Sequence, residues 1–321
     1  MTPRETQVDV SVVVVNYNTA HLLPEMRRCL LASKDDLRLE TIVIDNASRD
    51  DSRLVLARDF ADARVIFNSA NVGFGRANNQ ALSLITGRYV LLLNTDAFVA
   101  PDTLRRSVAY MDANPTCGIL GTRLIGRDGE LQPGCRHFPN PWNVFLHRAG
   151  VARFFPKVRM VDEPMDDSST PRECDWVPGC YMLIRKEVID RCGLFDPRYF
   201  LYVEEVDFCR RAKSAGWKVV YFPETSVVHV GGESAKSEAK LSSSGQISNL
   251  QIESELLYYR KHFGLPGVVA HVCLSWLADA VQALRWLVRG GAALGLRPVL
   301  EHALATGALF LKTRIGSVST R

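Results

Sequence analysis

Residues 88–98 read RYVLLLNTDAF, an apolar run that ends in polar residues. The run from Tyr89 to Leu93 is continuously apolar, which is typical of a strand buried on both faces of a sheet. It stops at Asn94 and Asp96, which are two positions apart and therefore point the same way in an extended chain. Oxygen ligands at the end of a core strand suit Mg2+ or Mn2+, with substrate phosphates completing the shell. The simpler interpretation is a polar turn that closes the strand.

The segments on both sides predict an α/β fold. We expect strands at 9–16, 40–44, 64–67, 89–93, 118–125, 182–184 and 218–222. We expect helices at 22–32, 50–58, 76–85, 102–111, 143–154, 186–191, 204–215 and 253–263. Because strands and helices alternate over the first hundred residues, this part should form parallel strands with right-handed crossovers.

Polar side chains follow three of the predicted strands at one edge of the sheet. Tyr17 follows the first strand, Asp45 the second, and Asn94 with Asp96 the fourth. A carboxylate such as Asp45 can accept the ring N–H of a pyrimidine, and Tyr17 could stack on the base. Arg76 near a helix start suits a diphosphate, although a solvated helix residue is the simpler interpretation. This convergence indicates a nucleotide site better than any one residue does.

Two further polar features lie in the second half of the chain. Glu204, Glu205 and Asp207 occupy the first turn of a predicted helix, directly after an apolar and aromatic run. Acids there complement the helix dipole, but one of them buried beside a substrate could be a general base. His229 in SVVHVGGES is, from its surroundings alone, more often a core or surface residue than a ligand.

Composition excludes several classes of protein. The chain has 321 residues, 47% of them hydrophobic and 23% charged, so a folded core is expected. The eight cysteines form no CxxC pair or zinc pattern, and the polar start shows no signal peptide, so we expect a cytoplasmic protein. No nucleic-acid motif occurs, and the GFG at 73–75 lacks the spacing of a dinucleotide fingerprint, which argues against a dehydrogenase.

The last part of the chain differs from the rest. Residues 258–321 hold eight Lys and Arg against two acids, Asp279 and Glu301. Within 268–288, Asp279, Gln282 and Arg285 fall on one helical face with apolar residues elsewhere. This pattern favours an amphipathic helix lying in the interface of an anionic membrane over one that spans it. The alternative is a helix that packs on the domain or in a homodimer interface.

The motifs together resemble glycosyltransferase family 2, which has the GT-A fold. They are VVVVNYN at 12–18, VIDNAS at 43–48, NVGFGRANN at 71–79, LLLNTDA at 91–97, WVPGCYMLIR at 176–185 and FLYVEEVDFCRR at 200–211. The branch most similar to them comprises bacterial rhamnosyltransferases of O-antigen and cell-wall polysaccharide synthesis. The resemblance implies an α/β fold with a Rossmann-like mixed sheet flanked by helices, in a domain spanning 1–263, followed by an amphipathic helical extension at 264–321.

The resemblance also assigns roles to residues. It implies that the donor is bound by Tyr17, Asp45, Arg76, Asn94 and Asp96. It implies metal ligands at Asp96 and His229, with Asn94 standing where the family's metal motif has an acid. It implies a general base at Glu205, with Asp207 as the alternative, and a sugar or acceptor pocket at Trp176 and Glu204.

The expected activity is therefore an inverting sugar transfer assisted by Mg2+ or Mn2+. The donor would be a dTDP- or UDP-sugar, with L-rhamnose as the candidate sugar, and the acceptor a saccharide or a lipid-linked saccharide. The enzyme would work in the cytoplasm or peripherally on the inner face of the membrane. The alternatives are a non-catalytic sugar-nucleotide or saccharide binding protein on the same fold, and a sugar nucleotidyltransferase, whose early Gly-rich phosphate loop is missing after Asn16.

Overall fold

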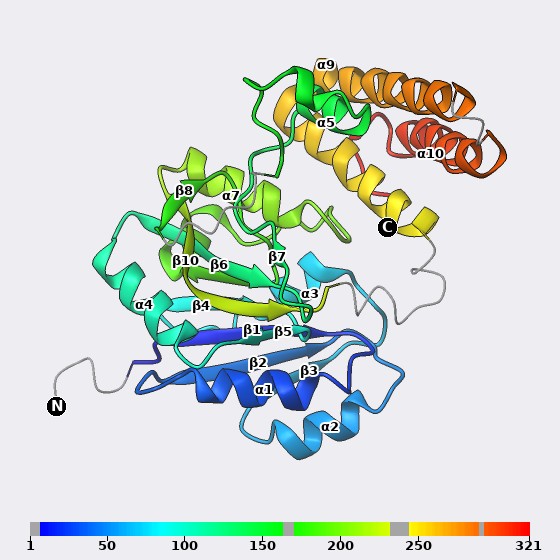
Figure 1. Cartoon of the computed structure of the whole chain (residues 1–321). Coiled ribbons are helices and arrows are strands. Elements are labelled where there is room, and N and C mark those ends of the chain that lie inside the picture. The colour runs from blue at the N-terminus through cyan, green and yellow to red at the C-terminus, as the bar shows by residue number, and fades with distance from the viewer. Residues whose placement is uncertain (1–6, 163–169, 232–243, 289–291) are drawn as a thin grey trace. The chain divides into compact units, whose positions relative to one another are not determined.

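The computed structural model describes residues 7–162, 170–231, 244–288 and 292–321 (Figure 1). The chain forms two compact units. The first comprises Met1–Arg136, Pro164–Asp196 and Glu205–Ser237, and the second comprises His137–Glu163, Pro197–Glu204 and Glu238–Arg321. The domain division predicted at residue 264 falls within helix α9 (Ser244–Val288) of the second unit.

The first unit is built on one mixed sheet. Its strands are β1 (Val10–Asn16), β2 (Leu39–Asp45), β3 (Arg64–Phe67), β4 (Tyr89–Leu93), β5 (Ala97–Val99), β6 (Cys117–Ile125), β7 (Leu131–Gln132), β8 (Arg172–Cys174), β9 (Tyr181–Arg185) and β10 (Lys218–His229). The order is β3-β2-β1-β4-β9-β6-β10-β5, with β7 paired to β6 and β8 to β10. Strands β3, β2, β1 and β4 are parallel, whereas β9 is antiparallel to both β4 and β6.

Apolar strands and amphipathic helices give this unit its core. Every residue of β4 is buried, as its continuous apolar run predicts. The helices of the unit are α1 (Leu23–Ala32), α2 (Ser52–Asp59), α3 (Phe74–Gln80), α4 (Thr103–Ala113), α6 (Lys186–Cys192) and α7 (Glu204–Ser214), the last beginning one residue before the unit resumes. Helix α1 buries Leu23, Met26 and Leu30 at helical spacing. The predicted α/β class with a mixed sheet is confirmed.

Several predicted boundaries were wrong, including the start of α9, which lies at Ser244 and not at residue 253. Strand β10 continues past Pro223 to His229, and its register against β6 shifts between Phe222 and Ser226. This irregularity accommodates a proline, which has no N–H to give to the ladder. Helix α3 begins at Phe74 and ends at Gln80, earlier at both ends than predicted. Helix α5 (Pro141–Arg148) begins earlier than predicted because Asn140 caps it in a capping box with Asn143, and it ends before a separate 3-10 turn at Ala152–Phe154.

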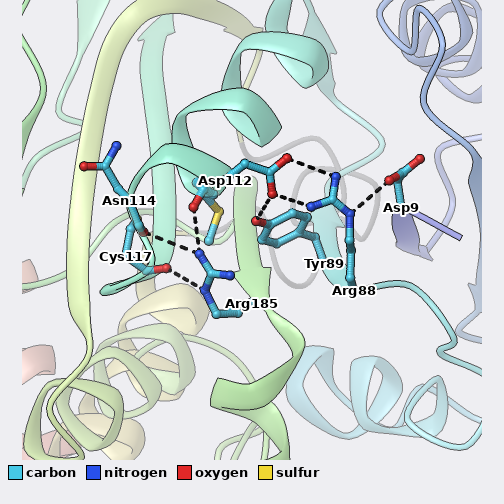
Figure 2. Close-up of polar contacts among 8 residues, drawn as sticks. Asp9, Arg88, Tyr89, Asp112, Asn114, Cys117 and Arg185 are labelled. Carbon is cyan, nitrogen blue, oxygen red and sulfur yellow. Dashed lines mark hydrogen bonds and ion pairs between the residues drawn. The ribbon is translucent and has the colours of Figure 1, made fainter. Parts of the chain in front are cut away.

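The amino end of β4 is fixed by a polar network (Figure 2). Arg88 donates to Asp9 at 2.9 Å and forms an ion pair with Asp112. The hydroxyl of Tyr89 donates to the same Asp112 carboxylate at 2.7 Å. Arg185, at the end of β9, donates to main-chain carbonyls at the end of α4 and the start of β6. These bonds connect two neighbouring antiparallel strands to the helix that covers them.

The second unit is helical. It contains α5, the 3-10 turn Ala152–Phe154, α9 and α10 (Ala292–Lys312). Helix α9 is kinked at Gly264, whose φ of 68° lies in the left-handed region, as the predicted helix end there anticipates. Its two halves are joined by His271, which stacks on Tyr259 at 4.2 Å and lies 3.4 Å from the carboxylate of Glu255.

Candidate active site

A chain of buried hydrogen bonds connects the carboxyl ends of β1, β2 and β4. The hydroxyls of Thr95 and Thr19 lie 2.8 Å apart, and Thr19 donates to the Asn16 side chain at 2.8 Å. The Asn16 amide donates to Ser48 at 3.0 Å, and the backbone N–H of Ser48 donates to Asp45 at 2.8 Å. The predicted convergence of these strand ends is therefore present. The residues that produce it were missed in the sequence, because small hydroxyl and amide side chains resemble ordinary turn residues.

Asp45 and Tyr17 lie at neighbouring positions of this edge. Asp45 is the last residue of β2 and pairs in register with Asn16, the last residue of β1, so Tyr17 directly follows that pair. The Asp45 carboxylate is buried, and Tyr17 is half-buried. A carboxylate at the end of a parallel strand with an aromatic ring from the adjacent strand end offers a hydrogen-bond acceptor and a stacking surface to a base.

Arg76 is positioned by an asparagine cluster. The Asn46 side chain donates to Asn71 at 2.8 Å and accepts from Asn68 and from the backbone N–H of Val72, each at 3.0 Å. These bonds fix the loop that enters α3, and Arg76 lies half-buried in the first turn of that helix. The sequence pattern NVGFGRANN marked this loop but did not reveal that Asn46 organises it.

Asp96 and His229 meet where β5 pairs with β10. Asp96 is buried, and its Oδ2 accepts from the backbone N–H of Gly231 at 3.1 Å. Its Oδ1 lies 3.8 Å from Nε2 of His229, the last residue of β10. The antiparallel register of His229 with Ala97 brings these two side chains together across 133 positions of sequence.

Gln132, which the sequence did not suggest, orients His229. Its amide nitrogen donates to the His229 carbonyl at 2.9 Å, and its amide oxygen lies 2.9 Å from Nδ1 of the same residue. Because an amide oxygen only accepts, Nδ1 carries the proton and Nε2 presents its lone pair toward Asp96. Burial lowers the pKa of His229 even though the charge of Asp96 opposes that shift, so the imidazole is neutral at pH 7.

This donor set fits a divalent cation held jointly with a ligand. In the part of the chain that the structure describes, no three His, Cys, Asp or Glu side chains form a metal cluster. A carboxylate and a neutral imidazole supply two ligands, and phosphate oxygens of a nucleotide would have to supply others. Asn94 is half-buried one position after β4, where its backbone N–H donates to the Cys180 carbonyl at 3.0 Å.

Glu205 has a buried carboxylate with a raised pKa. It is the second residue of α7, and burial raises its pKa above the ordinary value of a glutamate, although the charge of Arg136 opposes the shift. Its Oε2 is buried without a hydrogen-bond partner among the described residues. A buried carboxylate oxygen with no partner is costly and calls for a functional explanation. An incoming hydroxyl group would satisfy it.

Arg136 links Glu205 to Trp176. The Arg136 guanidinium carbon lies 4.8 Å from the centre of the buried Trp176 ring, in cation–π geometry. The backbone N–H of Arg136 also donates to the Trp176 carbonyl at 3.2 Å. Arg136 therefore holds the ring of a predicted pocket residue and acts electrostatically on the predicted base. Lying in a long irregular segment, it carried no sequence signal.

Asp207, on the same helical turn as Glu205, has different surroundings. Asp207 is buried and accepts from Arg211 Nε at 2.8 Å, and Arg211 also donates to main-chain carbonyls of the turn after α6. This pairing fits a structural role for Asp207 and favours Glu205 as the base. Glu204 is buried and follows Tyr202 and Val203, whose φ values of 70° and 72° are strained for residues with a side chain.

The sequence is related to known sugar-transferring enzymes. A family model described as "Glycosyl transferase family 2" matches residues 11–193. The N-acetylglucosaminyl-diphospho-decaprenol L-rhamnosyltransferase of Mycobacterium tuberculosis is 26% identical over 233 residues, covering 68% of this chain and 75% of that protein. The rhamnosyltransferase WbbL of Escherichia coli is 25% identical over 232 residues, covering 68% of this chain and 83% of that protein.

A solved structure supports the fold. The mannosyltransferase PcManGT from Pyrobaculum calidifontis, in complex with GDP-Man and Mn2+, matches with a TM-score of 0.57 at 18% identity. The match covers 98% of this chain and 88% of that one. At this identity the similarity establishes the GT-A-like arrangement of sheet and helices and nothing about the donor. Since the family model covers more than half of its length, the chain belongs to glycosyltransferase family 2 and is a glycosyltransferase.

Proposed function

We propose that the protein is an inverting transferase that moves a sugar, with L-rhamnose as first candidate, from a dTDP- or UDP-sugar to a saccharide or lipid-linked saccharide. The names of two relatives, both rhamnosyltransferases and one acting on a diphospho-decaprenol acceptor, support the sugar and the acceptor class. Such donors are made in the cytoplasm, so we place the active site there. The observation that carries the proposal is the buried Glu205 carboxylate, whose Oε2 has no hydrogen-bond partner among the described residues.

Glu205 acts as the general base in this proposal. Its pKa, raised by burial, makes it a better proton acceptor than an ordinary glutamate. Its free Oε2 accepts a hydrogen bond from the acceptor hydroxyl and removes the proton as that oxygen attacks the anomeric carbon. The nucleoside diphosphate leaves from the opposite face, so one displacement inverts the configuration without a covalent intermediate.

The donor occupies the carboxyl edge of the sheet. Asp45 accepts from the ring N–H of the pyrimidine, Tyr17 stacks on the base, and Arg76 pairs with the diphosphate. Asp96 and His229 would hold Mg2+ or Mn2+, with Asn94 beside them. When bound, such an ion neutralises charge that develops on the leaving diphosphate. Trp176 and Glu204 line the sugar or acceptor pocket.

Calorimetric binding of dTDP and UDP tests the donor site. Each nucleotide is titrated into the full-length protein with Mn2+, with Mg2+ and with EDTA. We expect binding that depends on the metal and a preference for one of the two pyrimidine nucleotides. A folded sample that binds none of these nucleotides would contradict the proposal.

A turnover assay distinguishes an enzyme from a non-catalytic binding protein. Release of dTDP or UDP from the matching rhamnose donor is measured with and without a diphospho-lipid saccharide acceptor. We expect release that depends on the acceptor and is lost in Glu205→Gln. A protein that binds the nucleotide tightly but releases none with any acceptor of this class would support a binding protein instead.

A further inference from the structure

The exposed side of α9 after its kink at Gly264 is entirely apolar. Every exposed residue that the structure describes between 265 and 288 is apolar. Along the helix they recur every three or four positions as Val269, Cys273, Trp276, Ala280, Leu284 and Leu287, with Leu277 and Val288 beside them. The stripe from Val269 to Leu287 is about 27 Å long at 1.5 Å per residue. We call these eight residues the apolar face.

The polar side of the same helix points inward, within the second unit. Asp279 is buried, with Oδ1 2.7 Å from Arg148 of α5 and Oδ2 2.9 Å from His302 of α10. Gln282 donates to the Arg148 carbonyl at 2.8 Å. Asp279 and Gln282, two members of the predicted polar stripe, therefore contact α5 and α10. A surface helix of a soluble protein packs its apolar side on the core and exposes its polar side. In this part of α9 the polar side packs on α5 and α10, and the apolar side is exposed.

Helix α10 extends this surface. Trp276 donates its indole N–H to the Ala303 carbonyl at 3.1 Å, so the apolar face meets α10 at that point. On α10, Leu300, Leu304 and Leu311 are exposed at helical spacing, with Leu304 at 74% and Leu311 at 75%. Figure 1 shows the two helices running beside each other. A continuous exposed apolar surface of this kind marks an interaction site.

The charge around the apolar surface is positive. Arg297, Lys312 and Arg314 on or just after α10 are exposed. The acids of the described part beyond residue 264 are Asp279, which is buried and paired, and Glu301, which pairs with Arg297 at 2.8 Å. Two copies joined through this surface would bring equal positive charges together, whereas an anionic lipid surface complements them.

We propose that α9 and α10 bind an anionic lipid bilayer, with the apolar face in the headgroup–acyl boundary and the lysines and arginines at the phosphates. Trp276 and Trp286, both partly exposed, are the residue type that favours this boundary. By length and composition alone α9 could cross a membrane. The kink at Gly264 and the ion pair of Asp279 with Arg148 favour a helix that lies in the interface.

Vesicle flotation tests this inference without any sugar donor. The full-length protein is mixed with vesicles of phosphatidylcholine alone or with about one-third phosphatidylglycerol, at low and high salt. We expect flotation with the anionic vesicles and at least about tenfold weaker binding to the neutral ones, with salt reducing the difference. Equal or absent binding to both vesicle types would overturn the proposal.

A matched pair of variants locates the surface. Leu284→Glu with Leu287→Glu places two carboxylates on the apolar face at exposed positions, where folding should tolerate them. We expect a loss of vesicle binding of roughly 100-fold, since charged residues are excluded from the acyl region. The control is Leu54→Glu on α2, an exposed leucine outside the surface, which should float like the unmodified protein.

Two further measurements test whether a second copy of the chain covers this surface and whether the variant still binds nucleotide. Light scattering of the protein without lipid should give a monomer; a stable dimer that Leu284→Glu with Leu287→Glu dissociates would replace the lipid by a second copy. Nucleotide binding by the same variant should be unchanged. Because flotation needs no nucleotide and calorimetry needs no lipid, failure of this inference is distinguishable from failure of the proposed function.

Discussion

The two ends of β4 differ in how their polar groups are satisfied. At the amino end, Arg88, Tyr89 and Asp112 bond to one another, and Asp9 takes the remaining donor of Arg88 (Figure 2). At the carboxyl end, Asp96 lies 3.8 Å from His229, longer than a hydrogen bond. At the amino end of β4 the polar side chains therefore satisfy one another. At its carboxyl end, Asp96 and His229 face each other without a hydrogen bond between their side chains.

The titration of the groups reflects this difference. Burial would raise the pKa of Asp112, but hydrogen bonds from Arg88 and Tyr89 outweigh it and lower the pKa. Burial and the bond to Asp112 raise the pKa of Tyr89 to about 12. On the other side of the sheet, burial dominates and raises the pKa of Glu205. In a network that stabilises the fold, each charged group has hydrogen-bond partners that offset its burial. In a catalytic site, a buried carboxylate can lack such partners until a ligand binds.

Removing the proposed base should have the largest effect. Glu205→Gln keeps the shape of the side chain but cannot accept the proton, so turnover should fall on the order of 10^2 to 10^4-fold with nucleotide binding retained. Donor consumption and calorimetry measure the two quantities. The control is Asp190→Asn, an exposed acid in an i,i+4 pair with Lys186. Near-normal turnover of Glu205→Gln would move the base to Asp207 or Glu204.

The predicted metal ligand comes next. Asp96→Asn should abolish the metal-dependent part of nucleotide binding, with a loss of more than about 100-fold, because a first ligand outweighs the 10- to 100-fold typical of an outer partner. Calorimetry with Mn2+ and with EDTA separates this part from the rest. Equal nucleotide affinity of the variant and the original protein in Mn2+ would remove Asp96 from the site.

Gln132 tests whether an outer contact supports that site. Gln132→Leu removes the acceptor that fixes the proton on Nδ1 of His229, so metal-dependent nucleotide affinity should fall about 10- to 100-fold. Gln132→Glu, which keeps an acceptor at that position, should recover most of it. Nitrogen NMR of His229 without metal should show the Nδ1–H tautomer in the original protein. The opposite tautomer would contradict the assigned role.

The amino end should respond in stability alone. Asp112→Ala leaves Arg88 and Tyr89 without their shared acceptor, and we expect a loss of about 1–2 kcal/mol, moderated because the Asp112 side chain is 46% exposed. Chemical denaturation measures this change. Nucleotide affinity should remain as in the original protein, and a large loss of affinity would mean that the two ends of β4 are not independent.

The smallest effect is the stability cost of the base itself. Because the pKa of Glu205 is raised in the folded state, ionising it there costs stability as pH rises above the unfolded value. Glu205→Gln should therefore stabilise the protein by about 1 kcal/mol for each pKa unit of the shift at pH above the folded pKa. The gain should vanish below about pH 4. Thermal unfolding from pH 4 to pH 8 measures it, and a variant less stable at pH 8 would contradict a raised pKa.

Local patterns located seven of the strands and drew attention to polar residues at their ends, whereas β5, β7 and β8 were not predicted. The run from Tyr89 to Leu93 could only be a buried strand, and its abrupt end marked Asn94 and Asp96. The passage of β10 beyond Pro223 could not be predicted, because proline normally ends a strand and only the neighbour β6 shows that a register shift accommodates it. The role of Gln132 was equally hidden, since a lone glutamine has no pattern.

The sequence by itself determined the α/β class, the family motifs and the set of acids that could do chemistry, because periodicity and short-range spacing are properties of the chain. Only the tertiary structure decided how those acids differ. Asp207 pairs with Arg211, whereas Oε2 of Glu205 has no hydrogen-bond partner in the described part of the chain, although the two residues lie on one helical turn. It also turned Asp279 inward and Leu277, Leu284 and Leu287 outward. Burial and charge compensation depend on what packs against each side chain, and that is set by contacts between segments far apart in sequence.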